Sequence, residues 1–482
     1  MWSFISTGIL CLLGVTFPSG VNASRLRSRE NDTATSLLLS SAATLSHNIS
    51  TVPRWSEFKA PSPGTIVNVA TEKDVAVTVK YCIKNNIPFL AQNGGHGWSS
   101  TFDLYSNGIL INLAGLNKVT FNTESTEVTL QGGALIENVI NAAYENNAQV
   151  LTGNCNCVGA LGAGLGGGYG NLLGLHGFSV DNMLSLNVVL ANGNYVTVTP
   201  ADKDLWWALR GAGPNFGIVT SAVMKAYPVP KANSTAWTGA LFFTEDKIEA
   251  LVQAIGNLEL TGGMNIFMYF VTTGPPSYTP TVLITPFYYG SEADGKAAFQ
   301  SIYDIEPYLD ETAEAIYTEW NAGATNFCED GGRKPSYSAG FMSMVPSVWR
   351  EIWNEFITFL KQPGTSSTTI LLEVYSLQYA QSIDPSTASF NNRNIRFNAA
   401  VIPWYSDARL DSIAETFGSS IRNLWRSVDQ LPESRTYVNF AHGDETNANV
   451  YSPENVHRLQ SKLNDILITQ ACYQAPARGF SA

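Results

Sequence analysis

The sequence predicts an α+β protein built from two unlike halves, and three observations lead to this fold class. From about residue 64, short runs rich in β-branched and aromatic residues alternate with amphipathic stretches. Glycine is dense before the "YPVP" at 227–230, and longer apolar runs begin after it. The chain has 482 residues, which is too long for one hydrophobic core, so at least two domains are expected.

The N-terminus predicts a targeting segment. Residues 8–17 form an apolar run that is too short to span a bilayer, and the small residues at 21–23 resemble a cleavage site. We expect a signal peptide over 1–23, a secreted protein, and a flexible lead-in over 24–59. Asn-X-Ser/Thr sequons then predict glycans at Asn31, Asn48 and Asn233, although a chain of this length also contains such sequons by chance.

Composition and cysteine usage exclude several classes of protein. Hydrophobic residues make up 45% of the chain and charged residues 14%, which is typical of a globular protein. The net charge of -12 argues against a nucleic acid or an anionic membrane as partner. Without the signal segment, five cysteines remain, and an odd number leaves at least one thiol outside any disulfide. Cys155 and Cys157 are too close in sequence to pair easily with each other.

Elements of the first half follow in order from residue 65. Strands are predicted at 65–70, 87–91, 108–113, 118–122, 127–133 and 148–153. Thr71 is expected to cap a helix that carries Val75 and Val79 on one face, and a second helix covers 134–145. Asn192-Gly193 predicts a hairpin, and residues 204–220 read as a short helix, a glycine-rich turn and a strand.

The second half predicts one large sheet. Apolar runs at 264–271, 281–290, 369–378 and 395–405 read as long strands. Amphipathic helices near 291–303, 345–361 and 408–426 would cover that sheet. No repeat with a period of 20–50 residues occurs.

Two glycine-rich stretches point to a ligand. The stretch "QNGGHGWS" at 92–99 places His96 in a loop after a strand, where it is either a surface histidine or one that holds a molecule close to the backbone. In residues 153–182, Gly162-x-Gly164-x-x-Gly167 formally matches a dinucleotide fingerprint, but the glycines that follow it disfavour the helix of a Rossmann fold. Glycine amides that approach a pyrophosphate, or a tightly packed turn, are the two remaining interpretations.

Six motifs in order carry a family resemblance. They are "PGTIV" near 62–67, "NGGHGWS", the central "CNCVGALGAGLGGGYG", "GFSVDN", "DLWWALRGAGPNFGIV" and the late "YVNFAHGD". Together they span about residues 60–230 and 435–445. In these motifs the chain resembles the flavoprotein oxidases of the vanillyl-alcohol-oxidase type, and within them the oxygen-dependent, berberine-bridge-enzyme-like branch, with fungal secreted members most similar.

The resemblance implies a two-part FAD-binding domain of the PCMH type, formed by residues 60–230 and the C-terminal segment 426–482. A substrate domain over 231–425, built on a large antiparallel sheet covered by helices, would be inserted between them. The family's usual Asp-Pro-x-Asn-Val-Phe ending is missing, so an atypical end is expected. The protein would act as a monomer on a small-molecule substrate and O2.

The same resemblance implies the cofactor contacts. His96 would be bonded covalently to the flavin of FAD, and Cys155, as a thiolate, would form a second covalent bond. Gln92, Asn93, Gly94, Gly95 and Gly97 would contact the phosphates. Gly159, Gly162, Gly166, Gly167 and Gly168 would flank the flavin and pyrophosphate, while Gly217, Ile218 and Val219 would line the adenine side. No metal site is predicted.

The substrate chemistry is predicted less sharply. Tyr437, in the family's "Y-x-N-Y" segment, is the first choice for a catalytic base, provided that its neighbours lower its pKa from about 10. A core tyrosine is the alternative. His176, His442 and Asp444 are either bases or polar wall. Strand aromatics would stack on a sugar or a planar molecule, or would fill the sheet core, namely Tyr269, Tyr288, Tyr289, Tyr375 and Trp404.

Three functions are compatible with these residues. The favoured one is an FAD-linked tailoring enzyme of secondary metabolism that performs dehydrogenation, hydroxylation or oxidative cyclisation. The second is a secreted carbohydrate or alcohol oxidase that produces H2O2. The third is a catalytically silent flavoprotein or binding protein that keeps the fold.

Overall fold

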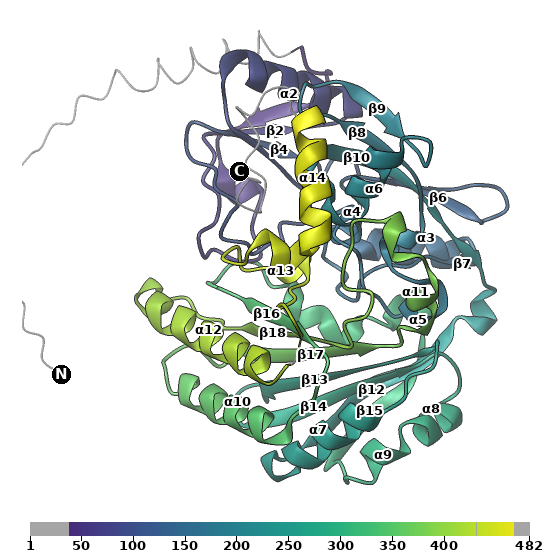
Figure 1. The fold of residues 1–482 in the computed structure, drawn as a ribbon, viewed down its shortest axis with the longest axis vertical. Coiled ribbons are helices and arrows are strands. Elements are labelled where there is room, and N and C mark those ends of the chain that lie inside the picture. The colour runs from purple at the N-terminus through teal and green to yellow at the C-terminus, as the bar shows by residue number, and fades with distance from the viewer. Residues whose placement is uncertain (1–37, 430, 467–482) are drawn as a thin grey trace, which may run out of the picture.

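The computed structural model describes residues 38–429 and 431–466, which form an N-terminal part and a large sheet layer joined face to face (Figure 1). The predicted signal segment, Asn31 and Cys472 lie outside these residues. Asn48 and Asn233 are exposed. Within the described residues, no helix is long and apolar enough to cross a membrane.

A four-stranded sheet begins the N-terminal part, in the order β1-β2-β4-β3. Its strands are β1 (Thr44–Ser46), β2 (Thr65–Asn68), β3 (Phe89–Gln92) and β4 (Ile109–Asn112). Helix α2 (Glu72–Asn85) starts at the predicted cap, where the Thr71 hydroxyl accepts from the Asp74 backbone and the Asp74 carboxylate accepts in return. The end of the predicted flexible lead-in is ordered, since β1 pairs with β2 and Trp55 is only 2% exposed.

A five-stranded antiparallel sheet follows, in the order β5-β6-β10-β8-β9. Its strands are β5 (Val119–Phe121), β6 (Glu127–Gln131), β8 (Met183–Val189), β9 (Tyr195–Val198) and β10 (Ile218–Lys225). The predicted hairpin joins β8 to β9, and Gly193 has a φ of +75° there. The helices of this part are α3 (Ile136–Glu145), α4 (Ala160–Leu165), α5 (Leu173–His176) and α6 (Lys203–Ala212).

The topology argues against a Rossmann fold, as the sequence did. The strand before the glycine cluster, β7 (Ala148–Gln149), pairs antiparallel with β11 (Tyr227–Pro228) rather than in a parallel sheet. One detail differs from expectation. Helix α4 contains two of the fingerprint glycines, Gly162 and Gly164, and ends before Gly166.

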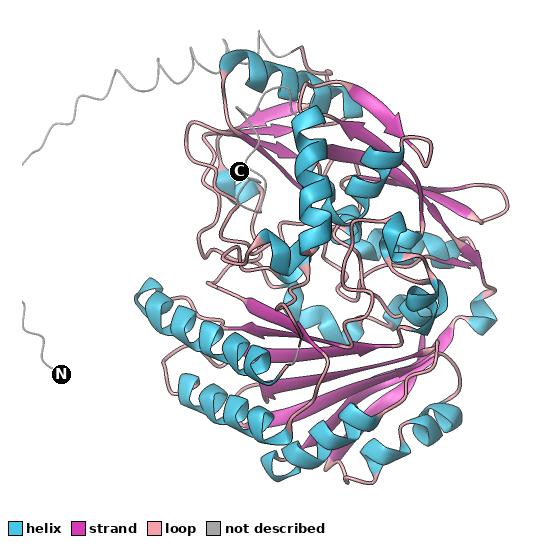
Figure 2. Cartoon of the chain, in the orientation of Figure 1, coloured by secondary structure: helices cyan, strands magenta, loops and turns pink. Residues whose placement is uncertain are grey.

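A seven-stranded antiparallel sheet forms the second layer, in the order β15-β12-β14-β13-β17-β18-β16. Its strands are β12 (Thr235–Phe243), β13 (Met264–Thr272), β14 (Pro280–Tyr288), β15 (Leu309–Ile316), β16 (Tyr337–Phe341), β17 (Thr369–Tyr375) and β18 (Phe397–Ile402). Helices flank this layer in Figure 2, namely α7 (Ile248–Asn257), α8 (Glu292–Ala298), α9 (Gln300–Tyr303), α10 (Pro346–Phe359) and α12 (Asp411–Val428). Helix α11 (Gln378–Ser382) packs instead beside α5 of the N-terminal part (Figure 1).

Side chains on the two faces of this sheet pack into two different hydrophobic cores. On β17, Ile370, Leu372 and Val374 pack into the core beneath α7, α10 and α12. The alternate residues Leu371 and Tyr375 belong to the core shared with the N-terminal part. The strand alternation therefore aims every second side chain at the junction of the two layers, and the predicted α+β fold class is confirmed.

The chain ends against the N-terminal part. Helices α13 (Asn447–Tyr451) and α14 (Pro453–Ile466) follow the sheet layer, and α14 stands beside α6 in Figure 1. Arg458 on α14 forms an ion pair of 3.1 Å with Asp204 and lies over the ring of Trp207. These contacts join α14 to α6 of the N-terminal part.

Candidate active site

A cavity of about 440 Å³ lies at the junction of the two layers. The loop after β3, helix α4 and the start of β10 line one side, and β13, β17 and β18 line the other. Most of the predicted cofactor residues line it, namely Gln92, Asn93, Gly94, Gly95, His96, Gly97, Cys155, Gly159, Gly162, Gly217, Ile218 and Val219. Segments that are far apart in sequence therefore meet at one site.

Three predicted glycines do not line the cavity, which corrects the sequence-based assignment. The positions of Gly166, Gly167 and Gly168 are set by packing instead. A Cβ on Gly166 would lie 2.2 Å from the Asn439 side chain, and one on Gly167 would lie 2.3 Å from Phe390. At these positions the tightly packed turn is the correct interpretation, because no side chain fits.

His96 is held as a neutral imidazole. Its ring stacks on Trp55 with centroids 5.7 Å apart. Burial, with smaller contributions from the charges of Lys334 and Arg54, lowers the pKa of His96 to about 4. At neutral pH the ring therefore carries a free lone pair, which is the form that can act as a nucleophile.

The residues around the cavity fit the diphosphate of FAD. Arg54 is half-buried at the glycine loop and donates to the Gln92 side chain at 3.1 Å and to the Gly97 carbonyl. Its Nε has no hydrogen-bond partner, and no carboxylate pairs with it among the described residues. An unpaired buried cation is costly unless an anion completes the site. Gly162 adds open space, since nothing lies within 4 Å of where its Cβ would be.

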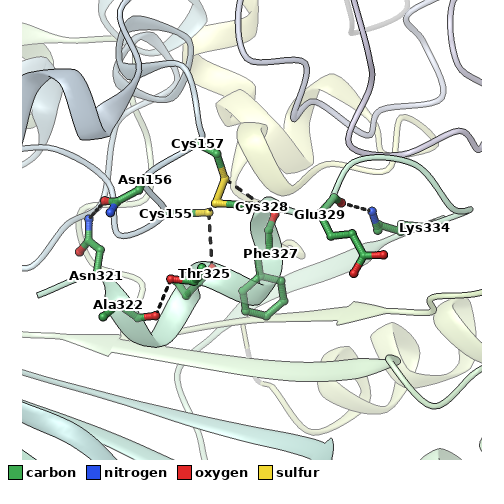
Figure 3. Close-up of a disulfide and its surroundings, with 11 residues drawn as sticks. Cys155, Asn156, Cys157, Asn321, Ala322, Thr325, Phe327, Cys328, Glu329 and Lys334 are labelled. Atoms are coloured by element: carbon green, nitrogen blue, oxygen red, sulfur yellow. Dashed lines mark hydrogen bonds between the residues drawn. A yellow bond between two sulfur atoms is a disulfide. The ribbon is translucent and has the colours of Figure 1, made fainter. Parts of the chain in front are cut away.

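Cys155 carries a protonated thiol at neutral pH in this structure, which holds no flavin. Burial raises its pKa to about 11, and the charge of Glu373 acts in the same direction. Its Sγ lies 3.5 Å from the Sγ of Cys157, which forms a disulfide with Cys328 (Figure 3). In this structure Cys155 is therefore the cysteine of this group that takes part in no disulfide.

Tyr437 lines the cavity but does not meet the condition set for a base. Its hydroxyl oxygen accepts from the Gly168 backbone at 3.1 Å and from Asn439 Nδ2 at 2.6 Å. Burial nevertheless raises the pKa of Tyr437 above its ordinary value, whereas catalysis required a lowered one. The alternative of a core tyrosine fits Tyr437 better, since it is 5% exposed and belongs to the shared core.

Glu373 is a carboxylate at the cavity that the sequence analysis did not single out. It projects from β17 into the cavity between Leu371 and Tyr375, and burial raises its pKa to about 7. The Tyr375 hydroxyl donates to its Oε2 at 3.1 Å, and Asn154 Nδ2 contacts that hydroxyl at 2.8 Å. The signal in the sequence was a single carboxylate inside the apolar run "TILLEVY". A pKa near neutrality, together with its place in the cavity, makes Glu373 a candidate proton acceptor.

The other predicted acid–base residues lie outside the cavity. His176 stacks on Tyr227, and His442 stacks on Tyr337 while its Nδ1 contacts the Ser336 carbonyl at 2.9 Å. Asp444 pairs with Arg422 at 2.6 Å. None of these three predicted residues lines the cavity.

The strand aromatics divide into two groups. Tyr269 and Tyr375 line the cavity, together with Phe267 on β13. Tyr289 packs on Trp320, and Trp404 lies over Lys334, so neither faces a substrate. Tyr288 packs against the core of the outer face.

Comparison with known proteins supports this picture. A family model described as an FAD binding domain matches residues 63–199. The FAD-linked oxidoreductase hasG of Aspergillus fumigatus is 30% identical over 430 residues, covering 85% of this chain and 90% of that protein. The FAD-linked oxidoreductase azaL of Aspergillus niger is 29% identical over 479 residues, covering 94% and 98%.

Solved structures share the fold. The xylooligosaccharide oxidase from Myceliophthora thermophila C1, in complex with xylobiose, matches with a TM-score of 0.77 and 21% identity over 94% of this chain and 98% of that one. The wild-type BBE-like 1 protein of Physcomitrella patens matches with a TM-score of 0.79 and 16% identity, covering 92% and 98%.

Proposed function

The chain belongs to the family of fungal FAD-linked oxidoreductases, and we propose that it oxidises a flat, largely apolar small molecule as a tailoring step of secondary metabolism. The proposal includes FAD bound covalently through His96 and also through Cys155, with O2 as the final electron acceptor. The observation that carries it is the position of Glu373, a half-buried carboxylate on the otherwise apolar and aromatic sheet side of the cavity.

The protein's part in the chemistry is to hold the substrate and to move one proton. When bound, FAD accepts a hydride from the substrate carbon and passes its electrons to O2, giving H2O2. Glu373 accepts the proton that leaves the substrate hydroxyl or acidic C–H. Tyr375, fixed by Asn154, holds the carboxylate in place with its hydrogen bond of 3.1 Å. The buried position of the carboxylate keeps its basicity near neutral pH.

The cavity wall favours an apolar substrate over a sugar. The sheet contributes Phe267, Tyr269, Leu371, Ala400 and Ile402 to the wall. A sugar carries hydroxyls on most of its carbons, and each hydroxyl that is buried without a partner costs about 1–3 kcal/mol. A planar polyketide or alkaloid buries its rings against aromatic side chains and needs only a few polar contacts.

A substrate panel under anaerobic conditions tests the proposed function. We expect planar phenolic polyketides or alkaloids to bleach the oxidised flavin band, and admission of air to restore the colour with release of H2O2. Cellobiose and xylobiose serve as the carbohydrate arm. Bleaching by the sugars alone would establish the carbohydrate oxidase, and a flavoprotein bleached by dithionite but by no panel member would support the silent protein.

Replacing His96 with Ala is expected to make the flavin extractable by acid, unless Cys155 alone retains it. The neutral imidazole is the group that would hold the cofactor. The measurement is the mass of the flavin-bearing peptides after digestion, compared with the wild type. A wild-type digest without a flavin on the His96 peptide would contradict covalent attachment at this residue.

We also propose a secreted monomer. Exposed Asn48 and Asn233 are available for glycans, and the net charge of -12 opposes an anionic partner. A mass shift on treatment with an endoglycosidase and a monomeric elution on size-exclusion chromatography are the expected results. Retention of residues 1–23 in the mature protein would contradict secretion by a cleaved signal.

A further inference from the structure

Three sulfur atoms and one imidazole meet beside the cavity. The reactive atoms of His96, Cys155 and Cys157 all lie within 4.8 Å of one another. Cys157 is bonded to Cys328, which lies 171 residues further along the chain (Figure 3). Cys155 and Cys157 lie in the same loop, and their Sγ atoms are 3.5 Å apart. Cys328 therefore lies close to two possible disulfide partners and is bonded to Cys157.

From this arrangement we propose that Cys157 is a positioning residue, which leaves Cys155 free for the cofactor by holding Cys328 in a disulfide. The inference rests on the proposed covalent FAD, and it concerns which of two neighbouring thiols is available. Without Cys157, the Sγ of Cys328 would face Cys155 alone, and a disulfide between them would block the second flavin bond.

Contacts other than the disulfide hold Cys328 in place. It ends the segment η7 (Ala322–Cys328), which Asn321 anchors by donating to the Gly153 carbonyl at 3.2 Å and to the Asn156 side chain at 3.0 Å. Asn321 also accepts from Asn171 at 3.3 Å. These bonds do not involve sulfur, so η7 should stay against the loop when Cys157 is replaced.

The segment also explains why the disulfide lies at the cavity. Ala324 and Phe327 of η7 line the cavity, and Phe327 stacks on Tyr269 with centroids 6.4 Å apart. A bond between this segment and the loop that carries Cys155 therefore fixes the wall and, at the same time, removes Cys328 as a competitor for Cys155.

The chemistry is an ordinary thiol oxidation. Two thiols lose two protons and two electrons to a disulfide oxidant such as oxidised glutathione, which becomes two thiols. In the wild type the new S–S bond joins Cys157 to Cys328. In a variant without Cys157, the same oxidant would join Cys155 to Cys328.

The test uses a matched pair of variants that break the same disulfide. We expect Cys157→Ser, expressed as the full chain and equilibrated with a glutathione redox buffer, to give a Cys155–Cys328 disulfide and flavin on His96 only. We expect Cys328→Ser, and the double variant Cys157→Ser/Cys328→Ser, to keep Cys155 out of any disulfide and bonded to the flavin. Non-reducing digestion with mass spectrometry of both peptides supplies the measurement.

A role that is only structural predicts a different pattern. If the disulfide only stabilised the wall, the two single variants would carry the same amount of flavin on Cys155. The double variant would then carry no more than Cys157→Ser. Either result, or flavin on Cys155 in Cys157→Ser, would overturn the proposal. If the wild type carries no flavin on Cys155, the covalent attachment fails, but a Cys155–Cys328 disulfide in Cys157→Ser would still support the selection of partners, and its absence would refute it.

Discussion

Glu373→Gln is expected to lower the rate of flavin reduction by about 10²–10⁴-fold, the usual contribution of a positioned general base. The amide keeps the shape of the side chain and its contact with Tyr375, but it cannot accept a proton. The measurement is the rate of anaerobic bleaching with the substrate that the panel identifies. Flavin content of the variant should match that of the wild type, because Glu373 lies on the sheet side of the cavity.

The pH dependence follows from the raised pKa. Because Glu373 has a pKa of about 7, wild-type turnover should rise as the pH increases through 7. Tyr375→Phe is the matched control. It keeps the carboxylate and removes the hydroxyl that bonds to Glu373 and Asn154, so the loss should be several-fold rather than a hundredfold. A Glu373→Gln variant with wild-type rates would exclude Glu373 as the base.

The folding stability of the wild type should fall as the pH rises, whereas its turnover should rise. A carboxyl whose pKa rises from 4.5 in the unfolded chain to about 7 on folding costs stability as the pH rises between these values. The cost is absent below 4.5 and complete above 7. Glu373→Gln removes it, so the variant should melt at a higher temperature than the wild type at pH 8, and at nearly the same temperature at pH 4. If the variant and the wild type melted at the same temperature at pH 8 as well as at pH 4, the Glu373 carboxylate would not destabilise the folded protein.

The sequence could predict the fold because its signals are local. Thr71, the Asn192-Gly193 turn and the apolar runs of the large sheet act over a few residues, and each lies where the pattern indicated. The partner of Cys157 could not be read in the same way, because 171 residues separate it from Cys328. Only the packing of η7 on the loop brings the two sulfurs together.

Only some of the residues at the cavity could be predicted, namely those with a local signal in the sequence. The loop that carries His96 was found because glycine marks a close approach to the backbone, and it does line the cavity. The glycines at 166 and 167 look the same in the sequence, but glycine is required there because the side chains of Phe390 and Asn439 leave no space for a Cβ. Glu373 was missed because an apolar strand does not reveal which of its two faces meets a ligand.

Arg393→Met is expected to destabilise the protein by about 3–5 kcal/mol, the cost of leaving one partner of a buried ion pair alone. Arg393 and Asp181 are 6% and 4% exposed at their side chains. The guanidinium donates to both carboxylate oxygens, at 2.5 and 2.8 Å. The pair joins the glycine-rich turn before β8 to the segment before β18, so its loss should loosen the junction that forms the cavity.

The double variant Asp181→Asn/Arg393→Met separates the charge from the packing. Removing both charges eliminates the isolated carboxylate, so the double variant should be more stable than Arg393→Met alone. The amide oxygen introduced by Asp181→Asn would still accept the Phe178 backbone N–H, which the Asp181 carboxylate accepts at 2.9 Å. Urea unfolding followed by flavin fluorescence measures both variants. If the double variant were less stable than Arg393→Met, the buried charge would not be the cause, and the packing of the Arg393 side chain on Phe178 would account for the loss.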